Sequence, residues 1–318
     1  MESKMKLSVI MCVYNTPREI LLPSLESVAS QRCNHPYEFI IVDDGSNDDT
    51  HKILEQFTSE NSYAKLCTQT NEGIASARNS GLKNSSGNLV YWIDSDDLLK
   101  PNAFQVIIDK FNQYPDIAFL SFGWTELRKR RKIEWKVTKK ERIIDTHEIL
   151  YSLCGDFLFK GYVWNKVFNL DVIGRDIQGF DTSFKVFEDK IWMLELGSRL
   201  TKALLIPDSL YIYKFNPGSI TRDMKSLRAR QFKYYEANER IVSMAKQFGD
   251  DIYYAALEYY FSLAINDYFY WLFMSKDRKN ELKKNRNAVE KIIERLEYKR
   301  IKSRYLSFLY RTFRVINR

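Results

Sequence analysis

The sequence predicts an α/β fold in which a mostly parallel central sheet has helices on both faces and is followed by a C-terminal α-helical region. Three observations support this prediction. Short apolar runs alternate with helix-compatible stretches between residues 6 and 110, the βαβ rhythm of a parallel sheet. Two of the apolar runs end directly in clustered aspartates, as buried strands do where an open sheet binds ligands. From Ser226 onward the chain shows helical patterns and no candidate strand.

The elements follow in order along the chain. The predicted strands are Lys6–Val13, Glu38–Val42, Lys65–Thr68, Asn88–Ile93 and Ile117–Phe122. The helices between them are Glu19–Gln31, Asp49–Ser59, Ile74–Asn84 and one from Pro101 to about Tyr114. The charged segment Arg128–Lys140 is typical of a solvated hairpin or loop. Three long C-terminal helices are predicted at Leu227–Phe248, Asp250–Met274 and Lys276–Leu296.

The 318-residue chain therefore divides into residues 1–225, with halves 1–97 and 98–225, and a helical region, 226–318, with a basic tail. The helix predicted over residues 250–274 is long enough to span a bilayer, but Glu258 and Asp267 lie inside it and would be costly there. A helix packed in a bundle or a dimer interface is the better interpretation.

The four cysteines form no C-x-x-C pair, which argues against a zinc site and a disulfide framework. We expect reduced thiols in a cytoplasmic protein, and we interpret Leu7–Tyr14 as the first strand rather than a signal peptide. Charge is uneven. Residues 276–318 contain 15 lysines and arginines against 5 acids, whereas the rest of the chain is nearly neutral. The basic tail could therefore meet an anionic surface.

Three aspartates, Asp94, Asp96 and Asp97, follow the apolar run that ends at Ile93. Their charges repel one another unless a cation lies between them, and Mg²⁺ or Mn²⁺ takes oxygen ligands of this kind. The alternative is that Ser95 and the acids cap a following helix, which explains one acid well and three poorly. The stretch favours a metal site.

Two further segments contain side chains that could bind a ligand. Asp43 and Asp44 end the second predicted strand before a Gly-Ser turn, where they would accept hydrogen bonds from a nucleobase or ribose, or cap the next helix. Arg78 lies in the helix that follows Asn71-Glu-Gly73. It could pair with phosphate, hold an acidic cluster in place, or simply lie on a helix surface.

These pieces, in this order, resemble the family 2 glycosyltransferases, enzymes of GT-A fold that move a sugar from a nucleotide-sugar donor. The matching motifs are Ser8-Val-Ile-Met-Cys-Val-Tyr-Asn15, Val42-Asp-Asp-Gly-Ser46, Asn71-x-Gly73 with Ala77-Arg-Asn-Ser-Gly81, and Asp94-Ser-Asp-Asp97. The resemblance implies that Val13 and Tyr14 meet the nucleobase and that Asp43 or Asp44 binds the base or ribose. Asp94 and Asp96 then correspond to the DxD pair. Asp94 would contact the donor or support the site, and Asp96 would coordinate Mn²⁺ or Mg²⁺.

The same resemblance assigns roles in the second half of residues 1–225. Val186-Phe-Glu-Asp-Lys-Ile-Trp192 resembles the ED motif, so Asp189 is the candidate general base and Glu188 its partner. Trp164, Asn165 and Lys166 match a W-N-K segment that would line the acceptor side, although a hydrophobic anchor with two surface polar residues explains them nearly as well. Ser219, Thr221 and Arg222 match an S-x-T loop that would bind the donor diphosphate. No histidine lies near this loop, which leaves the metal's full ligand set open.

The sequence thus predicts a metal-dependent, inverting hexosyl- or N-acetylhexosaminyltransferase of a bacterial surface-polysaccharide pathway, such as capsule, exopolysaccharide or O-antigen synthesis. It would use a UDP-sugar and a lipid-linked saccharide acceptor. The tail interleaves basic and apolar residues, which suits a helix on the inner face of the plasma membrane or one packed on its own bundle, and the C-terminal helices could form a homodimer. The alternatives are a nucleic-acid-binding protein, which leaves the acids unexplained, and an inactive partner subunit.

Overall fold

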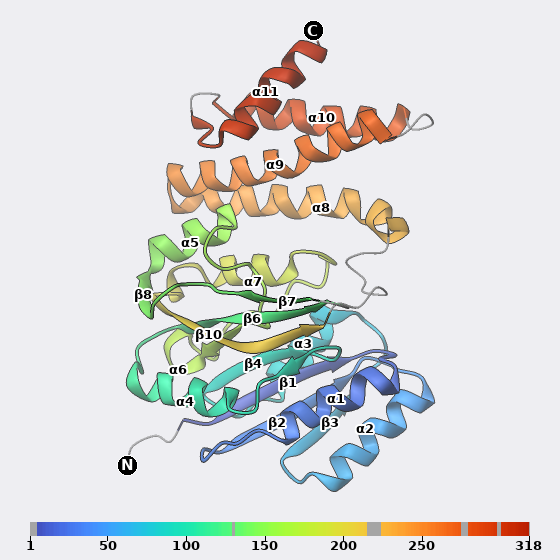
Figure 1. The fold of residues 1–318 in the computed structure, drawn as a ribbon, viewed down its shortest axis with the longest axis vertical. Helices are drawn as coiled ribbons and strands as arrows, with labels where there is room; N and C mark the ends of the chain where they lie inside the picture. Colours follow the sequence, from blue (N-terminus) through green and yellow to red (C-terminus); the bar gives the residue numbers. More distant parts are fainter. Residues whose placement is uncertain (1–4, 129–130, 215–223, 275–278, 298–299, 318) are drawn as a thin grey trace.

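The molecule has an α/β layer at one end and a stack of long helices at the other (Figure 1). The computed structural model describes residues 5–128, 131–214, 224–274, 279–297 and 300–317. One sheet runs through the α/β layer in the order β3-β2-β1-β4-β9-β6-β10-β5, with β7 and β8 paired at its margins. The predicted α/β class with a C-terminal helical region is therefore confirmed.

The first four strands form the parallel part of the sheet. They are β1 (Leu7–Val13), β2 (Tyr37–Asp43), β3 (Ala64–Thr68) and β4 (Leu89–Asp94). In the register, Val13 lies opposite Asp43 and Cys12 lies opposite Asp94. Because parallel strands end at the same edge, the residues after β1, β2 and β4 are brought together there.

The remaining strands make the sheet mixed, so the mostly parallel prediction holds only for its first half. Strand β9 (Lys166–Asn169) runs antiparallel to both β4 and β6 (Phe119–Arg128), and β6 is parallel to β10 (Lys202–Lys214). Short antiparallel partners lie beside them: β5 (Leu98–Leu99), β7 (Arg131–Trp135) and β8 (Arg142–Asp145). Strand β7 makes the predicted charged segment a hairpin with β6.

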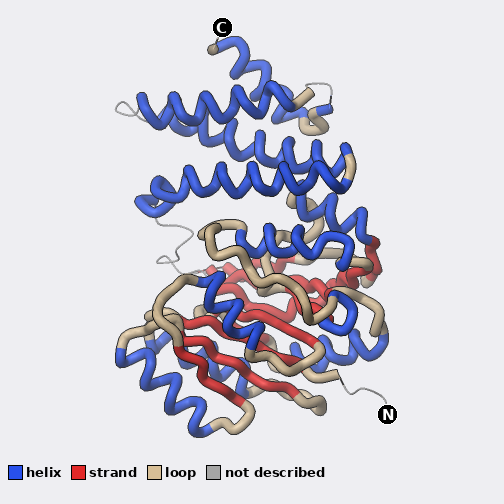
Figure 2. The backbone as a smooth tube through the Cα atoms, turned by 180° about the vertical axis from the view of Figure 1, so that it is seen from behind, coloured by secondary structure: helices blue, strands red, loops and turns tan. Residues whose placement is uncertain are grey.

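Helices cover both faces of the sheet (Figure 2). Alternate side chains of β1 and β4 point to opposite faces, so Met11 and Ile93 join one apolar core and Ile10 and Trp92 join another. The first core contains α1 (Arg18–Ala29), α2 (Asp48–Glu60) and α4 (Ala103–Gln113). The second contains α3 (Ile74–Lys83), α5 (Thr146–Gly155), α6 (Leu170–Ile173) and α7 (Glu188–Leu196).

The helical region continues the second core. It consists of α8 (Met224–Ala245), α9 (Asp250–Met274), α10 (Lys279–Arg295) and α11 (Arg304–Ile316). Residues of α5, α7, α8 and α9 belong to one apolar cluster, so the boundary proposed near residue 225 does not interrupt the core. Helix α9 begins and ends where the sequence predicts it, and it packs within the bundle against α5, α8 and α10. Among the described helices, none is long and apolar enough to cross a bilayer.

Candidate active site

The loops after β1 and β2 form the first side of the site. Tyr14 is 52% exposed at the sheet edge, whereas Val13 is buried and its carbonyl accepts a hydrogen bond from Asp44 N (2.9 Å). Asn15 ties the two loops together, since its amide donates to Ser46 Oγ (3.1 Å) and its side-chain oxygen accepts from Asn47 N (2.7 Å). Tyr14 therefore offers a flat, accessible ring on a pinned backbone, which suits contact with a nucleobase.

Asp43 and Asp44 are both buried, and their carboxylates already have partners. Asp43 accepts from Ser46 N (2.9 Å) and hydrogen-bonds His51 Nδ1 (2.7 Å). The bond with Asp43 raises the pKa of His51. His51, in the first turn of α2, is a neighbour that the sequence did not single out. A ligand could bind the Asp43 carboxylate only by replacing its hydrogen bonds with Ser46 and His51 or by adding to them.

Asp44 instead holds the loop that leads into α3. Its carboxylate accepts hydrogen bonds from Gln69 Nε2 (2.8 Å), Glu72 N (3.0 Å) and Gly73 N (2.9 Å). Gly73 has φ +90°, a conformation that favours glycine. Asp44 thus orders the turn before Arg78 through two backbone amides and the Gln69 side chain, whereas the side-chain partner of Asp43 is His51.

The acids Asp94, Asp96 and Asp97 form a turn rather than a helix start. Strand β5 follows at Leu98, and the next helix begins only at Ala103, after Asn102. The helix-cap alternative is therefore wrong. Asp97 is 1% exposed and accepts from Tyr211 Oη (2.8 Å) and Lys214 N (2.8 Å), which fastens the turn to β10. Burial, reinforced by Asp94 and Asp96, raises the pKa of Asp97.

Tyr211 is the main support of this turn that sequence reasoning missed. Its hydroxyl donates to Asp97 and accepts from Asp94 N (3.3 Å). We expect Tyr211→Phe to lower the free energy of unfolding by about 1–3 kcal/mol, because both buried groups lose a partner. Urea unfolding would measure the loss. Tyr270→Phe, at an exposed position on α9, is the matched control, and equal stability of the two variants would contradict the supporting role.

Asp94 and Asp96 have the chemistry that a divalent cation requires. No other described residue donates a hydrogen bond to either carboxylate, and the charged neighbour of Asp94 is Arg78, whose nearer nitrogen lies 3.9 Å from Asp94 Oδ1. Burial raises the pKa of Asp94 to about 6 and also raises the pKa of Asp96. Within the described residues no group of three or more metal-binding side chains is present. Asp94 and Asp96 fit a cation that takes one or two carboxylates as ligands and completes its coordination shell with substrate phosphates and water.

Arg78 joins the acid turn to the second half of the site. It is 6% exposed on α3, donates to Glu188 Oε1 (2.7 Å) and has its other nitrogen 3.9 Å from Asp94 Oδ1. Its guanidinium also lies over the Phe180 ring, 5.5 Å from the centroid. These contacts exclude the helix-surface role for Arg78 and show that it lies against the acidic cluster, while pairing with phosphate stays a prediction.

Helix α7 presents Glu188 and Asp189 at its first turn. Phe187, just before them, adopts φ 60°, a strained conformation for a bulky residue that starts the helix abruptly. Asp189 accepts a hydrogen bond from Lys190 N (2.8 Å). Burial, and then the charge of Glu188, raise the pKa of Asp189 to about 7, against the opposing charge of Arg78. A carboxylate with a pKa near 7 is well matched to accept a proton.

The W-N-K segment lies beneath the surface. Asn165 and Lys166 are 0% exposed, and Lys166 Nζ donates to the carbonyls of Lys160 (2.6 Å) and Tyr162 (2.7 Å). Burial lowers the pKa of Lys166 to about 7. The description of these two residues as surface polar groups is therefore wrong, and any role toward an acceptor is indirect. Lys166 thus holds the backbone at residues 160 and 162, and Asn165 accepts a hydrogen bond from Lys166 Nζ (2.8 Å).

Trp164 is the centre of an aromatic stack. Its ring lies 5.0 Å from that of Tyr162 and 4.7 Å from that of Tyr211. Tyr162 is 41% exposed, so it rather than Trp164 reaches the surface. The stack connects the W-N-K segment to the acid turn through Tyr211. Ser219, Thr221 and Arg222 lie outside the described residues, in the segment that follows Lys214.

Comparisons with known proteins relate the chain to glycosyltransferases. The family model of Glycosyl transferase family 2 matches residues 8–159. The uncharacterized glycosyltransferase EpsJ of Bacillus subtilis (strain 168) is 26% identical over 217 residues, which are 67% of this chain and 62% of EpsJ. The match thus spans less than two thirds of that relative's length.

Solved structures share the fold. S. aureus TarS 1–349 in complex with UDP-GlcNAc matches with TM-score 0.72 and 20% identity, over 93% of this chain and 82% of that one. The mannosyltransferase PcManGT from Pyrobaculum calidifontis, in complex with GDP-Man and Mn²⁺, matches with TM-score 0.56 and 16% identity, over 99% and 81%.

Proposed function

We propose, from the match of residues 8–159 to the family model of Glycosyl transferase family 2, that the protein moves a sugar from a nucleotide-sugar donor to a hydroxyl of a saccharide acceptor, with inversion at the anomeric carbon. One observation carries the proposal. Arg78 links Asp94 of the acid turn to Glu188, next to Asp189, at the edge where β1, β2 and β4 end. This arrangement sets two carboxylates suited to a cation beside a carboxylate suited to accept a proton.

The proposed reaction is a single displacement. The acceptor oxygen forms a bond to the anomeric carbon while the bond from that carbon to the donor phosphate breaks. The electron pair leaves with the nucleoside diphosphate, and Asp189 takes the acceptor's hydroxyl proton. Arg78 holds Glu188 and keeps Asp189 oriented at the start of α7. Asp94 and Asp96 would hold Mn²⁺ or Mg²⁺, which when bound neutralises charge on the diphosphate.

The donor side is proposed to be UDP-linked. Tyr14 would stack on the base, Asp43 would bind the base or ribose after His51 moves, and Ser219, Thr221 and Arg222 would meet the diphosphate. The TarS structure with UDP-GlcNAc and the PcManGT structure with Mn²⁺ support a metal-bound nucleotide sugar on this fold. A hexose or N-acetylhexosamine would be transferred. We place the enzyme in bacterial surface-polysaccharide synthesis, acting on a lipid-linked saccharide in the cytoplasm.

A nucleoside-diphosphate release assay tests the proposal without knowledge of the acceptor, because donor hydrolysis by water needs none. The donors would be UDP-glucose, UDP-galactose, their N-acetylamino forms and dTDP-rhamnose, each with Mn²⁺ or with EDTA. We expect Mn²⁺-dependent release from one donor or a few related ones. An inactive partner subunit would release nothing from any donor. A nucleic-acid-binding protein would instead bind DNA at moderate salt and show no Mn²⁺-dependent UDP binding.

Helix α11 supports a further part of the proposal, contact with an anionic membrane. One face packs on the bundle through Leu306, Leu309 and Phe313, while Phe308 (63% exposed) and Val315 (71%) lie on the other with several arginines. We expect the protein to sediment with phosphatidylglycerol vesicles, and we expect Phe308→Ser to reduce the fraction that does so. Sedimentation unaffected by this change would contradict the membrane contact, and a dimer measured by light scattering without vesicles would assign the face to a second copy.

A further inference from the structure

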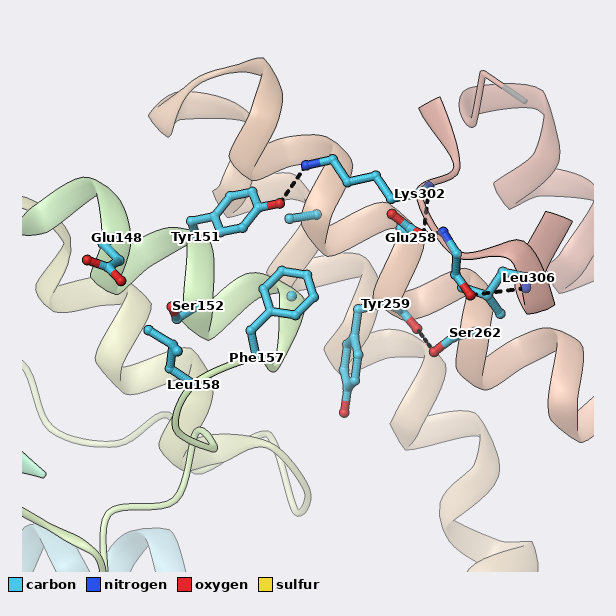
Figure 3. A pocket seen from close by; sticks show the side chains of 13 residues that line it. Glu148, Tyr151, Ser152, Phe157, Leu158, Glu258, Tyr259, Ser262, Lys302 and Leu306 are labelled. Atoms are coloured by element: carbon cyan, nitrogen blue, oxygen red, sulfur yellow. Dashed lines mark hydrogen bonds between the residues drawn. The ribbon is translucent and has the colours of Figure 1, made fainter. Parts of the chain in front are cut away.

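A second cavity lies between the α/β layer and the helical region, outside the proposed active site. Its volume is about 660 Å³, within the range of about 300–1,000 Å³ that is usual for ligand sites. Helix α5 and the loop after it form one wall, α9 forms the other, and the segment that enters α11 forms the rim (Figure 3). Because residues of three distant segments build it, the cavity exists only when the helical region is docked.

Flat aromatic rings line this cavity. Tyr151 and Phe157 stack with centroids 5.2 Å apart, and Tyr259 faces them from α9 (Figure 3). Phe157 is 54% exposed although it is wholly apolar. A side chain at Gly155 would lie about 2 Å from the Phe157 ring, so the glycine permits this ring position. The cavity therefore presents one accessible aromatic ring, that of Phe157, beside the partly buried rings of Tyr151 and Tyr259.

The rim of the cavity carries charges of both signs. Lys302 Nζ donates to Tyr151 Oη (2.7 Å), which uses one of the three donors of its ammonium group. Glu258 accepts on one oxygen from the amides of Lys302 and Ser303 (3.1 Å each), which leaves its second oxygen toward the cavity side. Glu148 lies on the opposite wall. Donors and acceptors thus surround the aromatic faces.

This combination selects among possible ligands. A purely apolar chain would displace water from the polar groups of Lys302, Glu258 and Glu148 on the rim and would offer them no hydrogen bonds in exchange, which costs free energy. A phosphate or a nucleic acid would meet the carboxylates of Glu148 and Glu258. A saccharide presents C–H groups on one face of each ring, which pack on aromatic rings, and hydroxyls at the edges, which both donate and accept.

We propose that this cavity is a second saccharide-binding site, which holds a part of an oligosaccharide chain away from the reacting end. The choice of a saccharide chain as natural ligand rests on the proposed function, but binding needs neither donor nor metal. Tyr259 connects this cavity to α7, the helix that carries Asp189. The Tyr259 ring lies 4.3 Å from Lys190 Nζ, and Lys190 follows Asp189 on α7.

A glycan array of bacterial surface oligosaccharides, probed with the full chain in EDTA, tests the site. Titration calorimetry would then measure the affinity of the best-bound glycan for two variants. We expect Phe157→Ala to weaken binding by roughly two- to tenfold, through loss of one aromatic contact. Lys302→Met should weaken it by about tenfold or more, through loss of a charged donor. Phe273→Ala and Lys291→Met, which change exposed residues outside the cavity, are matched controls and should bind as the unaltered chain does.

Two results would overturn the proposal: no glycan of the array is bound, or binding survives both cavity variants unchanged. Release of nucleoside diphosphate by the same variants separates this site from the proposed function. Glycan binding without any donor turnover would retain the saccharide site and refute the proposed transferase function. Donor turnover without glycan binding would retain the transferase function and refute the saccharide site.

Discussion

Replacing Asp189 with Asn should lower kcat by about 10²–10⁴-fold and leave nucleotide-sugar binding nearly unchanged. The carboxylate at the start of α7 is the proposed proton acceptor, and general-base assistance is typically worth this much. An amide of the same shape keeps the hydrogen bond from Lys190 N but cannot take a proton. Steady-state rates with the donor and an acceptor found in the release assay, together with calorimetric binding of UDP, would separate the two effects.

The pH dependence gives a second measure of the same residue. Burial and Glu188 raise the pKa of Asp189 to about 7, so its basic form predominates above this pH and is lost as the pH falls through it. We expect kcat/KM of the unaltered enzyme to decrease as the pH is lowered through about 7. The Asp189→Asn variant should not show this decrease. Asp208→Asn, an exposed change on β10, is the control. Full turnover by Asp189→Asn would assign the proton to another group.

The parts of the site that could be predicted from the sequence are those whose position follows from the pattern of neighbouring residues. Asp43 and Asp94 end apolar runs, and because parallel strands end at one edge, their proximity follows from the βαβ rhythm alone. The bounds of α9 were predictable for a similar reason. Gly249, at φ +120°, and two aspartates in the first turn mark its start.

The rest depends on contacts between residues far apart in the chain. The sequence assigned Asp97 either to a metal site or to a helix cap, but its partners are Tyr211 and Lys214, on a strand that only the mixed topology brings alongside. Strand β9 is four residues long and carries a fully buried lysine, so neither length nor hydropathy marks it. Arg78 could have lain on a helix surface, and its contact with Glu188, 110 residues away, excludes that role.

Replacing Asp96 with Ala should abolish most of the metal-dependent part of donor binding. Asp96 lies in a turn that Asp97 and Tyr211 hold rigidly, and no other described residue donates to its carboxylate. Loss of a residue that only supports a metal ligand typically costs about 10–100-fold in affinity, so loss of a ligand itself should cost at least as much. Calorimetric titration of Mn²⁺ in the presence of UDP would measure the change.

Thermal unfolding distinguishes a lost ligand from a damaged fold. Removing Asp96 relieves its repulsion with Asp94, so the variant without metal should melt no lower than the unaltered chain. A ligand that binds only the folded state raises the melting temperature by an amount that grows with the logarithm of its affinity, so Mn²⁺ with UDP should shift the unaltered chain and the control Asp48→Ala more than Asp96→Ala. An unchanged Mn²⁺ titration of Asp96→Ala would refute the assignment and leave Asp94 as the carboxylate to test, because it is the other acid of the turn whose carboxylate accepts no hydrogen bond from a described residue.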